Sequence, residues 1–280
     1  MLCVQIIDAV TGTSANYMTI ESNRHSRREF LAGALAVGAT AALPALPTAN
    51  RRSTGSSFVL VHGAWHGGWC WRRVADGLAA KGHYVSAPTL TGVGERTHLA
   101  SDAVGLSTHV DDIVNEIKWK DLDGIVLVGH SYGGMVITGV AERIRERIAA
   151  IVYLDAFIPL DGQPVTALRS PTATPYPTSM VPAPPAAQFK INEKDLAWVS
   201  SKLTPQPAKT FTEPLRVTGA YQTIAKKVYV RAPAFPQVGF DAAYQRVRAD
   251  RSWKTSEMSC GHDVMLDQPT QVIELLESVA

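Results

Sequence analysis

One serine of the sequence, Ser131, lies in a segment that can turn a hydroxyl into a nucleophile. Residues 129–133 read Gly-His-Ser-Tyr-Gly and match the pattern G-x-S-x-G. The apolar run "IVLV" precedes the pattern and predicts a buried strand, and from Met135 onward the apolar residues return at helical spacing. We therefore predict a sharp strand-to-helix turn that lifts the hydroxyl out of a sheet, beside a helix N-terminus that favours negative charge. The other interpretation, a loop serine between glycines, leaves the flanking strand and helix unexplained.

A serine hydroxyl needs a base to take its proton, and His262 is the best candidate. It lies in "SCGHDVML", directly after the last predicted strand (residues 252–259), and Gly261 gives this loop room to turn. The chain has seven other histidines in less suitable segments: His25, His62, His66, His83, His98, His109 and His130. Four of them can line the site, but none stands where a base would approach the serine from above: His62, His66, His98 and His130.

The negative charge that develops on an attacked ester oxygen needs two backbone N–H donors. One is that of Tyr132, directly after the serine. The other is expected in the loop after the first predicted strand, where Gly63 lets the chain turn and Ala64 follows it. We predict that four residues around these donors contact the substrate: Gly63, Trp65, His130 and Phe157.

The acid of a Ser–His–acid triad is harder to choose. The chain order serine, acid, histidine allows Asp155, Asp161 and Asp241, among others. The usual position follows the strand before the last one, but "VYVRAPAFPQVGF" holds no carboxylate before Asp241. Asp155 ends the apolar strand that follows the serine helix, where capping of loop amides would be its other role. We predict Asp155 as the acid and expect Asp241 to cap the helix that it begins.

Strands and helices are predicted to alternate, which favours a parallel sheet with helices on both faces. Residues 158–224 interrupt this alternation. The proline density of their first half excludes a strand, and "NEKDLAWVSSKL" predicts one helix capped by Asn192. We interpret these residues as an inserted lid. The alternative is a disordered linker between two domains, but residues 225–280 are too few to form a second domain. The six expected strands are residues 58–63, 83–89, 125–128, 148–157, 225–233 and 252–259.

Composition sets limits on the class of protein. The 280 residues, 46% hydrophobic and 19% charged, suffice for one well-buried α/β domain. A net charge of +2 gives no reason to expect a nucleic acid as partner. The three cysteines, Cys3, Cys70 and Cys260, lack the spacing of a metal site, and the sequence leaves open whether Cys70 and Cys260 pair.

The N-terminal segment has the pattern of a twin-arginine export signal. Arg27-Arg28 and Phe30-Leu31 precede an Ala-, Leu- and Val-rich stretch that ends in small residues and prolines. The stretch is too short and too rich in Ala and Gly to favour a membrane-anchoring helix. We expect residues 1–49 to be the signal and 50–56 a linker, and the mature protein to be periplasmic or secreted, without a stable membrane span. The sequence leaves open whether the signal is cleaved after Ala41 or after Ala49, and whether the chain starts at Met1 or at Met18.

Four segments together resemble a known family: "FVLVHGAWHGGWCWRRVADGLAAKGHYVSAPTLTGVGER", "VGHSYGG", "IVYLDAFIP" and "GHDVML". They are similar to the bacterial carboxylesterase branch of the α/β-hydrolase superfamily, which is related to plant methylesterases and hydroxynitrile lyases and includes esterases of carbamate pesticides. The resemblance implies an α/β-hydrolase fold with its core in residues 57–157 and 225–280 and its lid in 158–224. It also implies an esterase that uses Ser131, His262 and the N–H groups of Ala64 and Tyr132. The chain departs from the plant group because no acid follows its penultimate strand.

The predicted function is hydrolysis of small, fairly apolar esters, including carbamates or lactones, through an acyl-enzyme and without a metal or cofactor. Alternatives on the same scaffold are a hydroxynitrile lyase, a cofactor-free haloperoxidase, or a binding protein that has lost catalysis. Hydroxynitrile lyases carry a threonine in place of Gly63 and a lysine after the histidine, whereas here Asp263 follows His262. The presence of both Ser131 and His262 argues against a binding protein. The natural substrate and the oligomeric state are not predicted.

Overall fold

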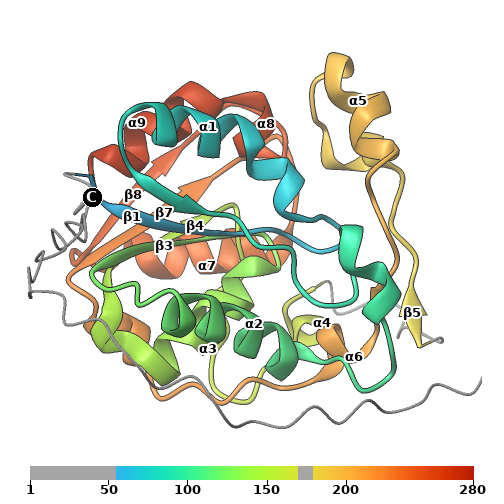
Figure 1. Ribbon diagram of the computed structural model, residues 1–280, viewed down its shortest axis with the longest axis horizontal. Coiled ribbons are helices and arrows are strands. Elements are labelled where there is room, and N and C mark those ends of the chain that lie inside the picture. The colour runs from blue at the N-terminus through green and yellow to red at the C-terminus, as the bar shows by residue number, and fades with distance from the viewer. Residues whose placement is uncertain (1–54, 170–178) are drawn as a thin grey trace, which may run out of the picture. The chain divides into compact units, whose positions relative to one another are not determined.

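A computed structural model describes residues 55–169 and 179–280, and these residues form a six-stranded sheet (Figure 1). Every neighbouring pair of strands is parallel. The predicted α/β fold with about six mainly parallel strands is therefore confirmed. In spatial order the strands are β2 (Tyr84–Ser86), β1 (Ser57–Val61), β3 (Ile125–His130), β4 (Ile148–Leu154), β7 (Lys226–Arg231) and β8 (Trp253–Glu257).

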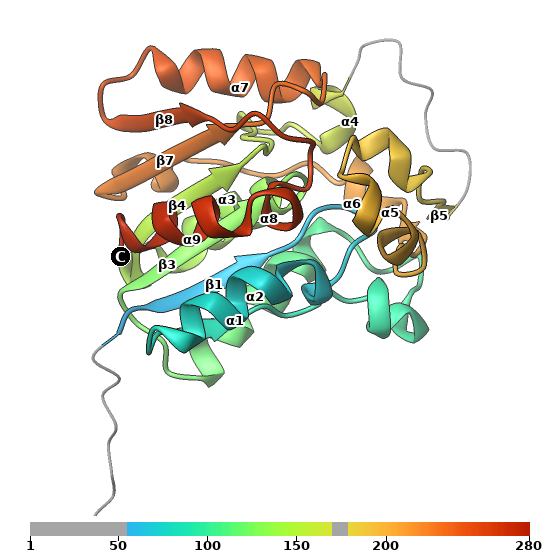
Figure 2. The ribbon, with the colours of Figure 1, turned by 90° about the horizontal axis from the view of Figure 1, so that it is seen from above.

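Helices cover both faces of this sheet, as Figures 1 and 2 show. One face carries α1 (Arg72–Ala80), α8 (Val264–Asp267) and α9 (Pro269–Glu277). The other carries α2 (Leu106–Trp119), α3 (Gly133–Ile144) and α7 (Val238–Arg248). Short 3₁₀ turns lie between the regular elements, at Gly68–Trp71, Gly94–Leu99, Arg145–Arg147, Ala186–Phe189 and Ala220–Thr223.

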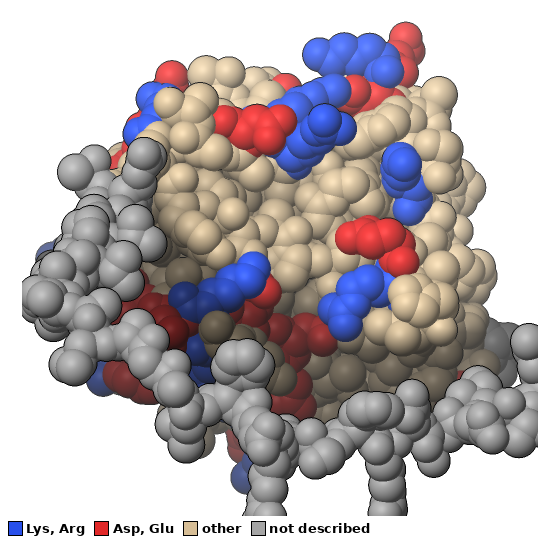
Figure 3. Space-filling view, viewed as in Figure 1, with Lys and Arg blue, Asp and Glu red and all other residues tan. Residues whose placement is uncertain are grey.

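The distribution of charge on the surface and the lengths of the helices test two of the predictions about partners. Where Figure 3 leaves the face uncovered by grey atoms, acidic and basic side chains are interspersed with broad uncharged areas. No helix in residues 55–169 or 179–280 is long and apolar enough to cross a membrane. The predicted export signal, residues 1–49, lies outside the described residues.

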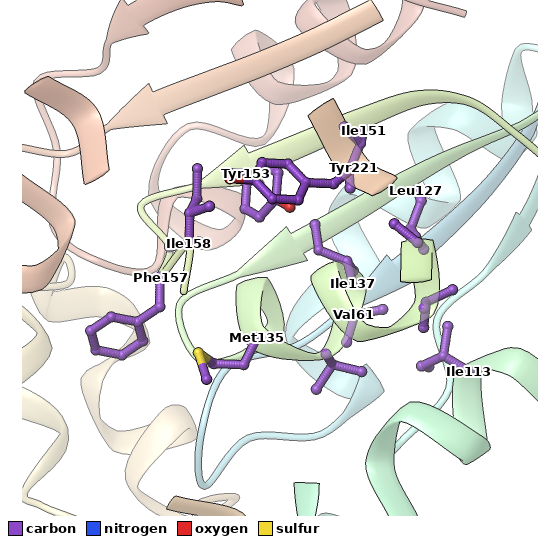
Figure 4. Packing of buried hydrophobic residues seen from close by; sticks show 14 of the residues in the cluster. Val61, Ile113, Leu127, Met135, Ile137, Ile151, Tyr153, Phe157, Ile158 and Tyr221 are labelled. Atoms are coloured by element: carbon purple, nitrogen blue, oxygen red, sulfur yellow. The ribbon is translucent and has the colours of Figure 1, made fainter. Parts of the chain in front are cut away.

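The core consists of one layer on each side of the sheet, because successive side chains of a strand point to opposite faces. In β1, Phe58 and Leu60 pack toward α1 and α9, whereas Val59 and Val61 pack toward α2 and α3. All six residues of β3 are buried, which explains its uninterrupted apolar run. Figure 4 shows the layer toward α2 and α3, where side chains of β3, β4 and α3 meet.

The strand register aligns the carboxyl ends of four strands. Val61 of β1 is opposite Gly129 of β3, and His130 of β3 is opposite Leu154 of β4. Leu154 is in turn opposite Val230 of β7. The residues that directly follow these strand ends therefore meet at one edge of the sheet, where ligands bind in open α/β sheets.

Between β4 and β7 the structure describes residues 158–169 and 179–224, and the helices and strands of this segment lie at this edge (Figures 1 and 2). The expectation that no strand crosses the proline-rich part is wrong, because β5 (Met180–Val181) pairs antiparallel with β6 (Gln206–Pro207). The strand is only two residues long, and Pro182, which has no N–H, follows it. The other regular elements here are α4 (Val165–Leu168), α5 (Glu193–Ser200) and α6 (Lys209–Thr212), and Asn192 caps α5 as predicted.

Candidate active site

Ser131 occupies the sharp turn between β3 and α3. Its φ of 54° lies in the left-handed region that residues other than glycine seldom adopt. The neighbouring glycines permit close packing around this turn. A Cβ on Gly133 would lie 2.7 Å from the carbonyl oxygen of Val61, and one on Gly134 would lie even closer to that of Phe157. Gly133, which ends the G-x-S-x-G pattern, and Gly134 after it are therefore needed sterically, because the turn packs against the backbone at the end of β1 and after β4.

The structure brings together His262 and Asp155, which are 107 residues apart in the sequence. Nδ1 of His262 lies 2.6 Å from Oδ2 of Asp155, and both side chains are buried. Because an ionised carboxylate only accepts hydrogen bonds, Nδ1 donates and Nε2 keeps the lone pair that a general base uses. Nε2 makes no hydrogen bond to any other residue in the described part of the chain.

Aromatic side chains fix the ring of His262. The ring of Phe235 stacks on it with centroids 4.3 Å apart, and that of Phe240 stacks at 5.3 Å. The backbone N–H of His262 donates to the carbonyl oxygen of Phe189 at 2.8 Å. The imidazole is therefore held by the lid and by the segment after β7, in addition to Asp155.

Arg231, the last residue of β7, binds the second carboxylate oxygen of Asp155. Its Nη1 lies 2.5 Å from Oδ1, and the N–H of Ala232 donates to the same oxygen at 2.9 Å. Burial alone would lower the pKa of Arg231, but Asp155 and Asp241 raise it overall. The triad acid usually follows the strand before the last one, which here is β7. In this chain β7 instead supplies Arg231, which holds Asp155 at the end of β4. Sequence analysis missed this role, for which the only signal was a charged residue in the apolar run "VYVRAP".

Asp241 does not cap α7, contrary to the expectation from the sequence. Gln237 is the N-cap, and its side chain accepts a hydrogen bond from the N–H of Gly239. The helix can therefore begin at Val238, and Asp241 lies within its first turn. The Asp241 carboxylate pairs instead with Arg231 at 2.9 Å and is 59% exposed. Of the two candidate acids, Asp155 is the one bonded to His262.

The predicted oxyanion donors, the backbone N–H groups of Ala64 and Tyr132, are unused. No acceptor among the described residues takes a hydrogen bond from either of them. The N–H of the next residue, Trp65, donates to Oε1 of Gln206 at 2.8 Å. Trp65 has a φ of 64°, and its indole N–H donates to the carbonyl oxygen of Val181 at 3.2 Å. The lid thus occupies the N–H of Trp65 and leaves that of Ala64 available.

Ser131 and His262 line one cavity of about 670 Å³. Of the four predicted substrate contacts, Trp65, His130 and Phe157 line it. Gly63 does not, because it has no side chain to reach the cavity and packs behind the serine turn. Sequence analysis did not assign the four further aromatic residues of the wall, which come from the lid and from the segment after β7: Phe189, Phe211, Phe235 and Phe240.

Burial makes most of the other histidines at this edge poor bases. It lowers the pKa of His62 to about 3 and that of His130 well below its ordinary value. It also lowers the pKa of His109, whose Nδ1 lies 2.8 Å from the hydroxyl of Tyr132. His66 differs, because its pKa is raised overall.

The cysteines and possible metal ligands of the described residues add no further chemistry to this edge. Cys70 and Cys260 are both free thiols, so the pairing that the sequence left open is not formed. Burial, with smaller contributions from nearby carboxylates, raises the pKa of Cys260 to about 12. Within residues 55–169 and 179–280, no group of three His, Cys, Asp or Glu side chains is arranged to hold a metal ion.

A parallel sheet with a serine on a strand-to-helix turn, and a buried histidine–aspartate pair at the same edge, defines a hydrolase of the α/β class. The sequence pattern of the Alpha/beta hydrolase family matches residues 58–275, and the chain belongs to that family. Within the family it is a carboxylesterase-type hydrolase.

Relatives with names and solved structures support this assignment. The chain is 39% identical over 241 residues to the carbendazim hydrolyzing esterase of Nocardioides sp. (strain SG-4G), which covers 80% of this chain and 99% of the relative. It is 38% identical to Methylesterase 1 of Arabidopsis thaliana over 104 residues, 36% of this chain and 40% of that protein. An extracellular α/β-hydrolase from a Paenibacillus species superimposes with a TM-score of 0.68 and 26% identity, over 80% of this chain and 99% of that one. Tomato Methylketone Synthase I shares the fold, with a TM-score of 0.67 and 21% identity over 80% of this chain and 97% of that one.

Proposed function

We propose that Ser131, His262 and Asp155 form a catalytic triad that hydrolyses esters through an acyl-enzyme. The observation that carries this proposal is the 2.6 Å contact between Nδ1 of His262 and Oδ2 of Asp155, beside the cavity that Ser131 also lines. That contact leaves Nε2 as the basic nitrogen of a ring in the cavity wall. The left-handed backbone of Ser131 is the strained turn that such a nucleophile needs.

The groups at this edge can carry out each proton transfer of the reaction. Nε2 of His262 takes the hydroxyl proton of Ser131 while Oγ forms a bond to the ester carbonyl carbon. The carbonyl electron pair moves to oxygen, where the N–H groups of Ala64 and Tyr132 stabilise it. The imidazolium then protonates the leaving alcohol as the carbon–oxygen bond breaks, and water repeats the sequence on the acyl-enzyme to release the acid.

The cavity wall supports flat, apolar substrates. The ring of Trp65 packs against those of Phe189 and Phe211, with centroids 6.3 and 5.5 Å away. Aromatic surfaces of this kind bind planar rings by stacking and by excluding water. We therefore propose small alkyl esters and carbamates of aromatic or heteroaromatic groups as substrates. Carbendazim, for which the Nocardioides relative is named, is a methyl carbamate of a flat heteroaromatic amine and fits this description.

The test is hydrolysis of p-nitrophenyl acetate and of carbendazim by the purified protein, with Ser131→Ala as the control. Both compounds should be hydrolysed, and the acetate should release an initial burst of p-nitrophenol that matches the enzyme concentration. Full activity of Ser131→Ala would overturn the triad. Turnover of the acetate without turnover of carbendazim would overturn only the carbamate part of the proposal.

The structure does not support the hydroxynitrile lyase alternative. A side chain at position 63, where those lyases carry threonine, would place its Cβ 2.9 Å from both His130 Nδ1 and Ser131 Cβ. After the histidine, where those lyases carry lysine, this chain has the acidic residue Asp263. Cyanide release from mandelonitrile would contradict this conclusion.

We also propose that the protein is exported by the twin-arginine route and acts in the periplasm or outside the cell. Arg27-Arg28, Phe30-Leu31 and the short apolar stretch after them support this proposal. Replacing both arginines by lysine should leave the precursor and its esterase activity in the cytoplasm of a host that has this route. Unchanged activity in the periplasmic fraction would contradict the proposal.

A further inference from the structure

A second buried histidine–aspartate pair, His66 and Asp263, lies beside the proposed triad and has no role in the steps above. Nε2 of His66 is 3.1 Å from Oδ2 of Asp263, and the two side chains are 1% and 0% exposed. Nδ1 of His66 is 2.7 Å from the carbonyl oxygen of Ala64. His66 follows β1, and Asp263 follows the proposed base, so the pair joins the two loops that carry the reaction's groups.

The surroundings of His66 require a charged ring. A carbonyl oxygen and an ionised carboxylate can only accept hydrogen bonds, so both ring nitrogens of His66 must donate. Burial alone lowers the pKa of His66, but Asp263 raises it overall. Burial alone likewise raises the pKa of Asp263, whereas His66, His130 and His262 bring it down to about 2. The two hydrogen bonds of His66 and the directions of both pKa shifts therefore favour an imidazolium paired with a carboxylate.

The two ends of this ion pair lie on different sides of the reaction. The positive end is on the loop that presents the N–H of Ala64, and the ring of His66 lines the cavity. The negative end directly follows His262, and the positive form of that ring contributes to the low pKa of Asp263. Coulomb attraction between a buried carboxylate and a neighbouring positive charge favours the charge separation in which the base has taken the serine proton.

If the His66–Asp263 pair served only to tie the two loops together, it would not need to be charged. Oδ1 of Asp263 is buried and accepts no hydrogen bond from the described residues, and Nε2 of His130 is 3.9 Å away from it. Nε2 of His130 is itself bonded to the carbonyl oxygen of His262 at 2.9 Å. A buried carboxylate with one unsatisfied oxygen is more costly than a neutral amide in the same position.

We propose that the His66–Asp263 ion pair is a positioning element whose fixed charges favour the charge separation of the transition state. Its positive end favours the oxyanion near Ala64, and its negative end favours the imidazolium at His262. Both effects grow as the serine proton moves, so the pair raises kcat more than it lowers KM. This inference rests on the proposed function, because it takes Ser131 as nucleophile and His262 as base.

The test uses three variants: Asp263→Asn, His66→Gln and the double variant that carries both changes. The double variant removes both charges and leaves two amides that can bond to each other, so it keeps a link between the loops. With p-nitrophenyl acetate, all three should lose about tenfold in kcat, less than the roughly 10²-fold that loss of a direct oxyanion donor costs. KM should change little in each of them, and Glu277→Gln, which removes the surface ion pair with Lys81, should leave kcat unchanged.

Two outcomes would overturn the inference. Wild-type kcat in the double variant, with low kcat in the single variants, would mean that an unpaired buried charge caused the loss. Wild-type kcat in all three variants would mean that the pair only stabilises the fold. Because the double variant carries no charge at positions 66 and 263, it tests the inference even where a single variant fails to fold. Ser131→Ala separates the two proposals. Full activity of this variant would overturn the triad, whereas the effect of changing His66 and Asp263 would still stand as measured.

Discussion

The two buried histidine–aspartate pairs of this protein differ in how many ring nitrogens the protein occupies. In His262, Asp155 binds Nδ1, and no described residue binds Nε2. In His66, Asp263 binds Nε2 and the carbonyl of Ala64 binds Nδ1. A ring with one unoccupied nitrogen can accept a proton and return it, whereas a ring with two donated hydrogen bonds loses one of them when it loses a proton. The same two residue types therefore suit proton transfer in one pair and a fixed charge in the other.

The two aspartates differ in the same sense. The second oxygen of Asp155 is bound by Arg231 and by the N–H of Ala232, so its orientation is fixed. The second oxygen of Asp263 has no hydrogen-bond partner in the described part of the chain. A carboxylate that must hold a ring in one tautomer benefits from a fixed orientation. One that acts through its charge depends less on orientation than on its distance from the groups it influences.

The largest expected effect separates the two histidines. His262→Gln should lower kcat for p-nitrophenyl acetate by about 10⁶-fold, since it removes the base of a triad. His66→Gln, measured under the same conditions, should have an effect smaller by several powers of ten. If His66→Gln were the more damaging change, the roles of the two pairs would be exchanged.

The next effect separates the two aspartates. Asp155→Asn should lower kcat by about 10³- to 10⁴-fold with little change in KM, because the amide favours the wrong tautomer of His262. Asp263→Asn leaves that hydrogen bond in place and should cost far less. Steady-state kinetics of the two purified variants measure the difference, and equal losses would show that Asp155 has no special role in orienting the base.

A third prediction concerns stability, and it applies to the His66–Asp263 pair. The pKa of His66 is raised from its ordinary value of 6.5, so its contribution is complete below pH 6.5 and is lost as the pH rises through the raised value. The pKa of Asp263 is lowered from 3.8 to about 2, so its contribution is complete above pH 3.8 and is lost as the pH falls through 2. The free energy of unfolding should therefore differ most between the wild type and the His66→Gln, Asp263→Asn double variant at mildly acidic pH.

Urea unfolding at about pH 5.5 and about pH 9 checks this prediction. The stability difference between the two proteins should be smaller at the higher pH. A difference that does not change between the two conditions would mean that His66 keeps the same charge at both.

The smallest effect is expected at Asp241, the rejected candidate for the triad acid. Its carboxylate is largely exposed, and Arg231 keeps its bonds to Asp155 and to the carbonyls of Ala232 and Phe235 when Asp241 is changed. Asp241→Asn should lower the free energy of unfolding by at most about 1 kcal/mol, because the carboxylate that it removes is largely exposed to solvent, and leave kcat nearly unchanged. A loss of kcat similar to that of Asp155→Asn would return Asp241 to the triad.

Local patterns predicted much of the fold and part of the site. The apolar run before Ser131 and the glycines around it specify a strand, a turn and a helix within about twenty residues. These three elements can therefore be predicted without tertiary information. Asn192 was likewise recognisable as a cap, because its side chain bonds to the N–H of Asp195 only three residues away. The strand β5 was missed because its partner β6 lies 25 residues further on, and pairing of so short a strand depends on that partner.

The sequence by itself determined the class of the fold, the position of Ser131 and the late position of His262, because each depends on residues that are neighbours in the chain. The sequence favoured Asp155 over Asp241 as the acid for His262, but only the tertiary structure showed their contact and paired Asp263 with His66. Asp155 meets His262 across 107 residues, and His66 meets Asp263 across 197, through contacts that no local pattern records. The physical reason is that a parallel sheet gathers the ends of strands that are distant in sequence at one edge, where burial makes every charge depend on its partner.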